Sequence, residues 1–188
     1  MRGSSIPPIP NAYWLRGRRV IAGEYPGAQS TKEAIERLNR FLDAGVTSFV
    51  DLTSTTDPLA PYDGLLMAEA ERRGIPVRYA RLTIRDMDVP PAAHMTVILD
   101  YIDAELARGA RVYVHCWGGV GRTGTVVGCH FVRGGCTGDE ALQRVAKHWD
   151  TMSAEKRVHH PNSPQTDPQR DFVRRWSETR TDARAERA

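Results

Sequence analysis

The sequence predicts an α/β protein with three layers, in which a central, mostly parallel β-sheet is flanked by α-helices. Short β-branched apolar runs alternate with longer segments whose apolar residues recur at helical spacing. The length of 188 residues and the 40% hydrophobic content suit a single core of ordinary size. We therefore expect one domain over residues 19–176, preceded by an extended lead-in over 1–18 and followed by a disordered tail over 177–188.

Four segments are expected to form the strands of the sheet. They are short, apolar and rich in β-branched residues, and turn or loop residues bound them. These strands are expected at residues 20–23, 46–52, 75–82 and 111–115. The second ends in a polar loop, and loops at the carboxyl ends of parallel strands commonly bind ligands.

The helices are recognised by their apolar spacing and by residues that begin or end them. Ser30 with Glu33 and Thr137 with Glu140 are capping boxes, and Pro90 is followed by a second proline that suits a helix start. Glycines end several of these segments. The helices are expected at residues 31–44, 65–73, 90–109, 125–133, 137–149 and 168–176.

Composition excludes several classes of protein. The 26 Lys and Arg residues against 23 Asp and Glu give a net charge of +3, and the basic residues are scattered, which argues against nucleic acid as a partner. No apolar run near the N-terminus predicts a signal peptide or membrane span. The three cysteines, Cys116, Cys129 and Cys136, have no paired spacing, so a disulfide framework is not expected. A reducing, cytoplasmic compartment fits best.

Residues 115–124 (HCWGGVGRTG) join a predicted strand to a predicted helix and form an anion-binding segment. Three interleaved glycines permit backbone angles that turn successive N–H groups toward one point. The following helix aims the positive end of its dipole at the same point, so a phosphate dianion fits there. The residues expected to contact it are Trp117, Gly118, Gly119, Val120, Gly121 and Arg122.

Three side chains of this segment are expected to perform chemistry. Cys116 lies at the base of the predicted nest, where the amide donors and the Arg122 cation favour a nucleophilic thiolate. The planar guanidinium of Arg122 can hold two phosphoryl oxygens at once, whereas a lysine supplies only a point charge. Thr123 is expected to donate a hydroxyl hydrogen bond to the sulfur.

The motif His115-Cys116-x5-Arg122-Thr123 resembles the signature of the protein tyrosine and dual-specificity phosphatase superfamily. The alternative is a glycine-rich turn around a buried cysteine. The resemblance extends over residues 22–176 and implies the fold of that superfamily. It also implies phosphoester hydrolysis through a phosphocysteine, without metal or other cofactor, and a His115 that orients the loop through a hydrogen bond.

The superfamily uses an aspartic acid on a separate loop to protonate the leaving oxygen. The segment Asp86-Met87-Asp88-Val89-Pro90 resembles that loop, and the acid four residues before the proline is Asp86. Arg85 stands where the family often has Trp-Pro. Asp88 is the alternative, although its place ahead of two prolines suits an acid at a helix N-terminus.

A glutamine in the superfamily positions the water that hydrolyses phosphocysteine, and the segment over residues 165–169 resembles the loop that holds it. Gln165 is the residue expected to do so. Gln169 is a supporting candidate, but it also completes a capping box with Thr166 and so has a structural explanation. The adjacent His159 and His160 are expected to be solvated rather than to bind metal, since no acidic or Cys partner is suitably spaced.

The expected substrate is a phosphorylated protein or a small phosphorylated molecule. The length resembles that of compact dual-specificity or bacterial tyrosine phosphatases. The loop interior lacks the lysines found in phosphoinositide phosphatases of the superfamily, yet inositol phosphates or lipids stay as alternatives, as does a phosphate-binding module without turnover. Loops at residues 54–62 and 86–91 are expected to select the leaving group, and oligomeric state is left open. We expect small buried thiols at Cys129 and Cys136 rather than redox partners.

Overall fold

The computed structural model describes residues 6–15 and 17–177, and its five strands form one sheet. The strand order is β1-β2-β5-β3-β4. Every neighbouring pair is parallel except β1 and β2, which are antiparallel. The expected mostly parallel sheet is therefore confirmed. The strands are β1 (Ala12–Trp14), β2 (Val20–Gly23), β3 (Ser48–Asp51), β4 (Arg78–Arg81) and β5 (Val112–His115).

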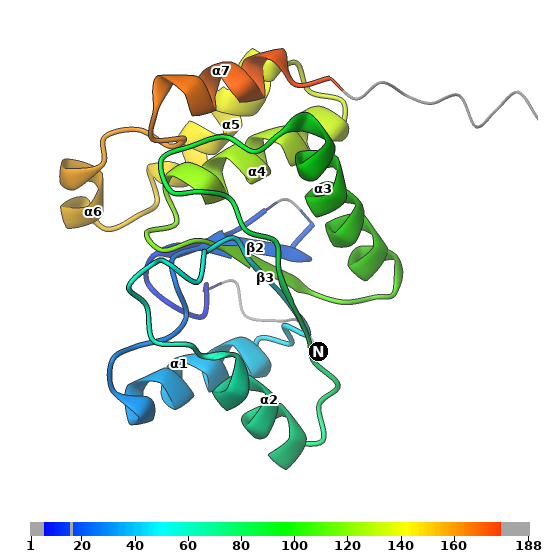
Figure 1. Ribbon diagram of the computed structural model, residues 1–188, viewed down its shortest axis with the longest axis vertical. Coiled ribbons are helices and arrows are strands. Elements are labelled where there is room, and N and C mark those ends of the chain that lie inside the picture. Colours follow the sequence, from blue (N-terminus) through cyan, green and yellow to red (C-terminus); the bar gives the residue numbers. More distant parts are fainter. Residues whose placement is uncertain (1–5, 16, 178–188) are drawn as a thin grey trace, which may run out of the picture.

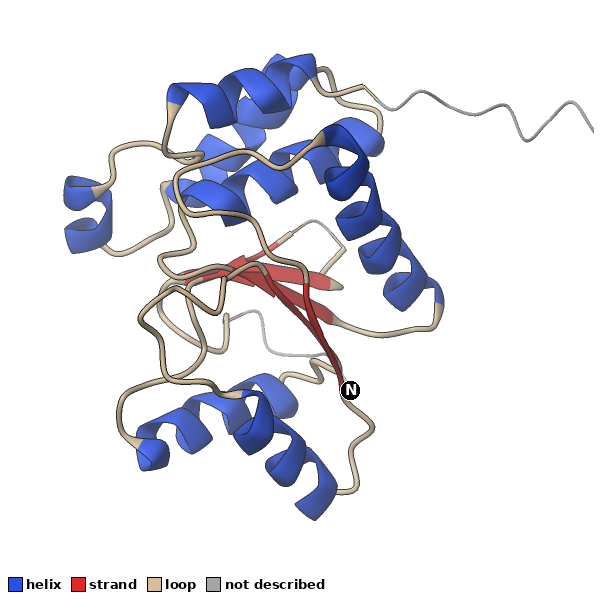
Figure 2. Ribbon diagram, viewed as in Figure 1, coloured by secondary structure: helices blue, strands red, loops and turns tan. Residues whose placement is uncertain are grey.

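Helices cover both faces of the sheet and complete the expected three layers (Figures 1 and 2). One face is covered by α1 and α2, and the other by α3 and α4, with α5 and α7 packed against α4. The short α6 lies at the side of the molecule. The helices are α1 (Thr31–Asp43), α2 (Asp63–Arg72), α3 (Ala92–Ala107), α4 (Gly121–Arg133), α5 (Gly138–Trp149), α6 (Ala154–His159) and α7 (Asp167–Arg175).

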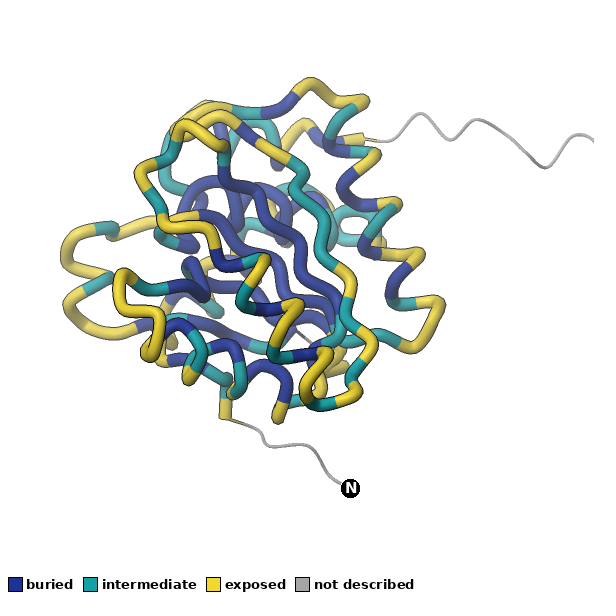
Figure 3. The backbone as a smooth tube through the Cα atoms, turned by 60° about the horizontal axis from the view of Figure 1, so that its bottom comes forward, coloured by how far each residue is buried: buried dark blue, intermediate teal, exposed yellow. Residues whose placement is uncertain are grey.

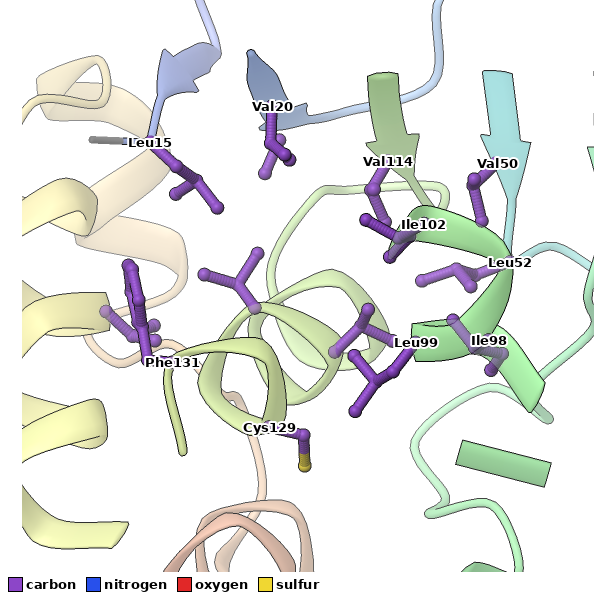
Figure 4. Packing of buried hydrophobic residues seen from close by; sticks show 14 of the residues in the cluster. Leu15, Val20, Val50, Leu52, Ile98, Leu99, Ile102, Val114, Cys129 and Phe131 are labelled. Atoms are coloured by element: carbon purple, nitrogen blue, oxygen red, sulfur yellow. The ribbon is translucent and has the colours of Figure 1, made fainter. Parts of the chain in front are cut away.

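The apolar core is divided between the two faces of the sheet. Successive residues of a strand point to opposite faces, so Val50 and Val114 belong to one cluster while Phe49 and Tyr113 belong to the other. Figure 4 shows the first two pointing toward helix residues such as Ile102. The central strands lie deep in the molecule, dark blue in Figure 3. The sheet is thus a rigid platform for the loops at its carboxyl edge.

The ends of the sheet differ from expectation. Ala12–Trp14, within the expected lead-in, pairs with β2 and supplies an edge strand. The segment at 75–82, expected in the core, contributes only Arg78–Arg81, which is part-exposed because it lies at the opposite edge. The expected tail over 177–188 lies outside the described residues except for Ser177.

Two helical features were missed. Helix α4 begins at Gly121 rather than Thr125, so Arg122 lies in its first turn. Residues 154–159, for which no helix was expected, form α6, which Ser153 caps by accepting a hydrogen bond from the backbone of Lys156. Across the described residues, no helix has the length and apolar content needed to cross a membrane.

Candidate active site

A pocket of about 220 Å³ opens beside the loop that joins β5 to α4. Residues from this loop meet residues from two other segments, the loop between β4 and α3 and the stretch before α7. The chain thereby brings together three motifs that are far apart in sequence. The pocket is lined by Asp86, Met87, Cys116, Trp117, Gly118, Val120, Gly121, Arg122, His160 and Gln165.

The loop that joins β5 to α4 is held by hydrogen bonds that its backbone carbonyls accept from neighbouring segments. The carbonyl of Trp117 accepts a 2.8 Å hydrogen bond from the Tyr25 amide, and the carbonyl of Val120 accepts one of 2.8 Å from the Ser163 hydroxyl. Gly119 has a φ of 71°, and a Cβ there would lie 2.5 Å from the carbonyl carbon of Gly23. The loop therefore needs glycine at 119 for both its angle and its packing.

Cys116 lies directly after β5 at the floor of this pocket and is 3% exposed. Trp117 and Met87 are about half exposed on the pocket lining, at 45% and 50%. The sulfur is thus reached through an opening with two large apolar side chains. A group bound above Cys116 would be shielded from bulk water by such neighbours.

The Arg122 guanidinium is almost wholly buried, with a side-chain exposure of 1%. Its Nη1 donates to Asp57 Oδ2 at 2.7 Å and to the Ile84 carbonyl at 3.3 Å. Its Nε and Nη2 are buried and, among the described residues, have no hydrogen-bond partner. One edge of the fork is anchored, and the other is available for two phosphoryl oxygens.

Asp86 is the second acidic neighbour of Arg122. Its Oδ1 lies 2.9 Å from Nη2 without the alignment of a hydrogen bond, so the contact is an ion pair, and the Asp86 side chain is 53% exposed. Burial alone would lower the pKa of Arg122, but the charges of Cys116, Asp57 and Asp86 outweigh it and raise the pKa. The guanidinium stays cationic in the pocket.

The structure places the two candidate acids differently. Asp86 lines the pocket, while Asp88 does not. The carboxylate of Asp88 accepts a 2.8 Å hydrogen bond from the amide of Val89, which suits an acid just ahead of α3. Between them, Met87 has a φ of 62°, which is uncommon for a non-glycine residue.

His115 ends β5 and is fully buried. Its Nδ1 lies 3.1 Å from the Cys116 carbonyl, which can only accept, so Nδ1 carries the proton. Its Nε2 then accepts a 2.6 Å hydrogen bond from the Tyr62 hydroxyl. Burial lowers the pKa of His115, so the ring is neutral at pH 7 and its 4.0 Å approach to Asp51 is not an ion pair there.

Asp51, behind the loop, is a buried carboxylate with several donors. Its Oδ1 accepts from the Thr53 amide at 2.8 Å and hydroxyl at 2.6 Å, and its Oδ2 accepts from the Tyr79 hydroxyl at 2.7 Å. Burial alone would raise the pKa of Asp51, but the charge of protonated His115 and these hydrogen bonds outweigh it and lower the pKa. Because His115 is neutral at pH 7, the hydrogen bonds keep Asp51 ionised there.

The two glutamines occupy different environments. Gln165 lines the pocket. Gln169 is fully buried and completes the capping box of α7 with Thr166, and its Nε2 donates to the Asp88 carbonyl at 3.2 Å. Gln169 thus supports α7 and the loop between β4 and α3.

Two expectations are corrected here. The Thr123 hydroxyl, expected on the sulfur, points instead at the Gly23 carbonyl, at a long 3.5 Å. His160, expected to be solvated, is only partly exposed, since it lines the pocket and its Nδ1 lies 3.5 Å from Nε2 of Gln165. In the part of the chain that the structure describes, no three His, Cys, Asp or Glu side chains gather as a metal site.

Asp57 is a residue of the site that sequence reasoning missed. It lies in the polar loop after β3, where a ligand-binding role was expected, but six of the residues from 51 to 57 are polar. Nothing in their spacing indicates which of them turns toward Arg122, 65 positions away. The contact depends on the parallel pairing of β3 with β5, which brings the two loops together.

Cysteine-dependent phosphatases use a cysteine and an arginine with unpaired donors beside a glycine-rich loop, and the fold and pocket place this chain in that class. Residues 14–173 match the family model described as "PTP-SAK: Swiss Army Knife protein, DSP-PTPase phosphatase domain". The chain belongs to this family.

Comparisons with individual proteins agree with this membership. Over 103 residues the chain is 29% identical to "Phosphatidylinositol 3,4,5-trisphosphate 3-phosphatase and protein-tyrosine-phosphatase PTEN1" of Arabidopsis thaliana. That match covers 54% of this chain and 23% of the relative, so the chain spans about a quarter of its length. Tk-PTP in its active form is 25% identical, with a TM-score of 0.61 over 87% of this chain and 94% of that one.

Two more distant structures share the fold. The core catalytic domain of the PP-IP phosphatase SIW14 from S. cerevisiae is 15% identical, with a TM-score of 0.62 over 94% of this chain and 91% of that one. A variant of P. aeruginosa TpbA in complex with pTyr is 18% identical, with a TM-score of 0.59 over 91% and 92%. Phosphatases with different substrates therefore resemble this fold.

Proposed function

We propose that this phosphatase hydrolyses phosphotyrosine, and other phosphorylated residues of proteins, through a phosphocysteine intermediate. The observation that carries the proposal is that Arg122 lines the same pocket as Cys116, while its buried Nε and Nη2 have no hydrogen-bond partner among the described residues. Two phosphoryl oxygens would satisfy these donors. The phosphorus would then lie within reach of the sulfur.

The first displacement forms phosphocysteine. The Cys116 thiolate attacks phosphorus, so that a P–S bond forms while the bond to the ester oxygen breaks. Asp86 gives its proton to that oxygen, which leaves as a neutral alcohol or phenol. Arg122 and the loop amides offset the charge on the phosphoryl oxygens throughout.

The second displacement restores the enzyme. Water held by Gln165 attacks phosphorus, the P–S bond breaks, and the Cys116 thiolate leaves with its electron pair. Asp86, now a carboxylate, takes the proton of the attacking water. The products are inorganic phosphate and the enzyme ready for another turnover.

Binding of substrate must also release Asp86 from Arg122. The ion pair at 2.9 Å uses the same Nη2 that a phosphoryl oxygen would take. Because Asp86 is half exposed and the contact is poorly aligned, the phosphate can displace it at small cost. The freed carboxylate takes up a proton from solvent and can then donate it to the leaving oxygen.

The pocket rim supports an aryl phosphate as substrate. Trp117 and Met87 expose apolar surface on the pocket lining and can pack against a phenyl ring. The loop interior, residues 117–121, has no lysine to meet further phosphates. The named activities of SIW14 and PTEN1 nonetheless favour an inositol phosphate or phosphoinositide as the second candidate.

Rates on a panel of substrates separate these candidates. Phosphotyrosine, phosphoserine, an inositol phosphate and a phosphoinositide are compared at matched concentrations, with Cys116→Ser as the control. We expect the highest kcat/KM with phosphotyrosine and no turnover by the variant. A higher value with an inositol phosphate would reassign the substrate, and turnover by Cys116→Ser would overturn the mechanism.

A further inference from the structure

The loop between β3 and α2 holds the phosphate-binding arginine through Asp57. The Asp57 side chain is 8% exposed and that of Arg122 is 1% exposed, so the 2.7 Å contact between Oδ2 and Nη1 is shielded from water. Arg122 begins α4 while Asp57 belongs to an irregular loop. Their pairing therefore joins two segments that no backbone hydrogen-bond ladder connects directly.

The Asp57 carboxylate is itself fixed by its own loop. Its Oδ2 also accepts a 3.0 Å hydrogen bond from the Ser54 amide, and the Asp57 amide donates to the Ser54 carbonyl at 3.1 Å. A carboxylate held in this way has little freedom to follow a moving partner. The anchor therefore defines where Nη1 of Arg122 lies.

The anchored edge determines the direction of the free edge, because a guanidinium is planar and rigid. With Nη1 occupied by Asp57 and by the Ile84 carbonyl, Nε and Nη2 are left without a hydrogen-bond partner from any described residue. Rotation of the plane would move both donors away from the phosphoryl oxygens. Misplacement by about 1 Å can cost about 10²-fold in rate.

The geometry points to Asp57 as a positioning residue that orients Arg122 for the phosphoryl group, a role that rests on the proposed function. It acts through Arg122 and does not itself line the pocket. Its negative charge opposes phosphate binding by Coulomb repulsion. Its orienting effect favours binding, so the two effects have opposite signs and can be distinguished.

The test is inhibition by inorganic phosphate and kcat/KM with p-nitrophenyl phosphate for Asp57→Asn and Asp57→Glu. The first variant removes the charge and the second keeps it but moves the anchor. We expect both to lower kcat/KM about 10- to 100-fold and to weaken phosphate inhibition. Tighter phosphate inhibition in Asp57→Asn, or an unchanged Asp57→Glu, would overturn the positioning role.

A double-mutant cycle with Arg122→Lys shows whether the effect passes through the arginine. Because lysine has no planar fork to orient, Asp57→Asn should change kcat/KM less than about 3-fold in that background. A loss there equal to that in the wild-type background would mean that Asp57 acts only through the fold. Melting temperatures of all variants report on folding separately.

Asp63→Asn is the matched control, since it makes the same change at the far end of the same loop, where α2 begins. It should leave kcat/KM and phosphate inhibition within about 2-fold of wild type. An Asp57→Asn variant no worse than Asp63→Asn would reject this inference alone. A wild-type enzyme inactive on aryl phosphates would instead reject the proposed function.

Discussion

The Tyr62 hydroxyl donates a 2.6 Å hydrogen bond to Nε2 of His115, and both side chains are buried. This contact fixes the tautomer of His115, whose Nδ1–H meets the Cys116 carbonyl. The aromatic ring of Tyr25 packs edge-on against both rings. The backbone position of Cys116 is therefore coupled to a residue at the start of α2.

Tyr62→Phe tests the hydrogen bond between Tyr62 and His115. The substitution keeps the ring and leaves the buried Nε2 of His115 without its donor, which should cost about 1–3 kcal/mol of unfolding free energy. We also expect a lower kcat, because His115 is free to reorient. Urea unfolding and steady-state kinetics measure the two effects. An unchanged free energy of unfolding would show that this hydrogen bond makes no net contribution to stability.

Asp86→Asn tests the acid on two substrates. Loss of proton donation should slow phosphotyrosine hydrolysis about 10²- to 10⁴-fold, while an aryl phosphate with an acidic phenol, which needs less help, should lose much less. Asp88→Asn is the control and should stay near wild type on both, because its carboxylate lies off the pocket lining. Equal losses by Asp86→Asn on the two substrates would contradict its assignment.

Replacing Gln169 should lower stability, whereas replacing Gln165 should slow the hydrolysis of phosphocysteine. Gln169→Ala removes half of the capping box of α7, so we expect about 0.5–2 kcal/mol of lost stability. For a chain of this size that corresponds to a fall in melting temperature of roughly 1–8 °C. Gln165→Ala should keep its melting temperature and accumulate phosphocysteine, seen as a burst of phenol release. If Gln165→Ala lowered the melting temperature and Gln169→Ala accumulated phosphocysteine, Gln169 would be the residue that positions water and Gln165 the structural one.

Stability should fall on acidification. Burial lowers the pKa values of His115, His130 and His148, so below about pH 6.5 the unfolded chain binds protons that the folded chain does not. This contribution to the free energy of unfolding is fully present well above about pH 6.5 and is lost as the pH falls toward the histidine pKa values of the folded state. Urea unfolding at pH 7.5 and 5.5 measures the loss, and His130→Asn should reduce it. Equal stability at the two pH values would be contrary to this expectation.

Asp51 adds a second window at lower pH. Because its pKa is lowered in the folded state, its contribution is present above about pH 4 and is lost as pH falls through the folded value. Protonation of the histidines and protonation of Asp51 both lower the free energy of unfolding. That free energy should therefore fall in two pH ranges, first near the histidine pKa values and then at lower pH.

Local sequence was sufficient for much of the fold and for the centre of the site. The capping boxes at Thr137 and Thr166 form as their spacing predicts. The Cys116 segment joins β5 to α4 as expected, because glycine spacing and strand pattern act over a few residues. The start of α4 at Gly121 was missed because its glycines disfavour a helix by propensity, while tertiary packing overrides that preference.

Features that depend on distant contacts could not be predicted. Asp57 reaches Arg122 only because strand order places their loops side by side, and one polar loop residue resembles another in sequence. The role of Ala12–Trp14 as an edge strand likewise depends on its pairing with β2. His160 lines the pocket through the path of the chain after α6, which no local pattern specifies.

The contact between Gly119 and Gly23 has a consequence for how this sequence can diverge. A Cβ at Gly23 would lie 2.7 Å from the Asn11 carbonyl oxygen, and one at Gly119 would lie 2.5 Å from the Gly23 backbone. A larger residue at either position forces main chain, not a flexible side chain, to move. Selection should therefore remove substitutions at either position. An alignment of relatives should show glycine at both, even where Trp117 and Met87 vary.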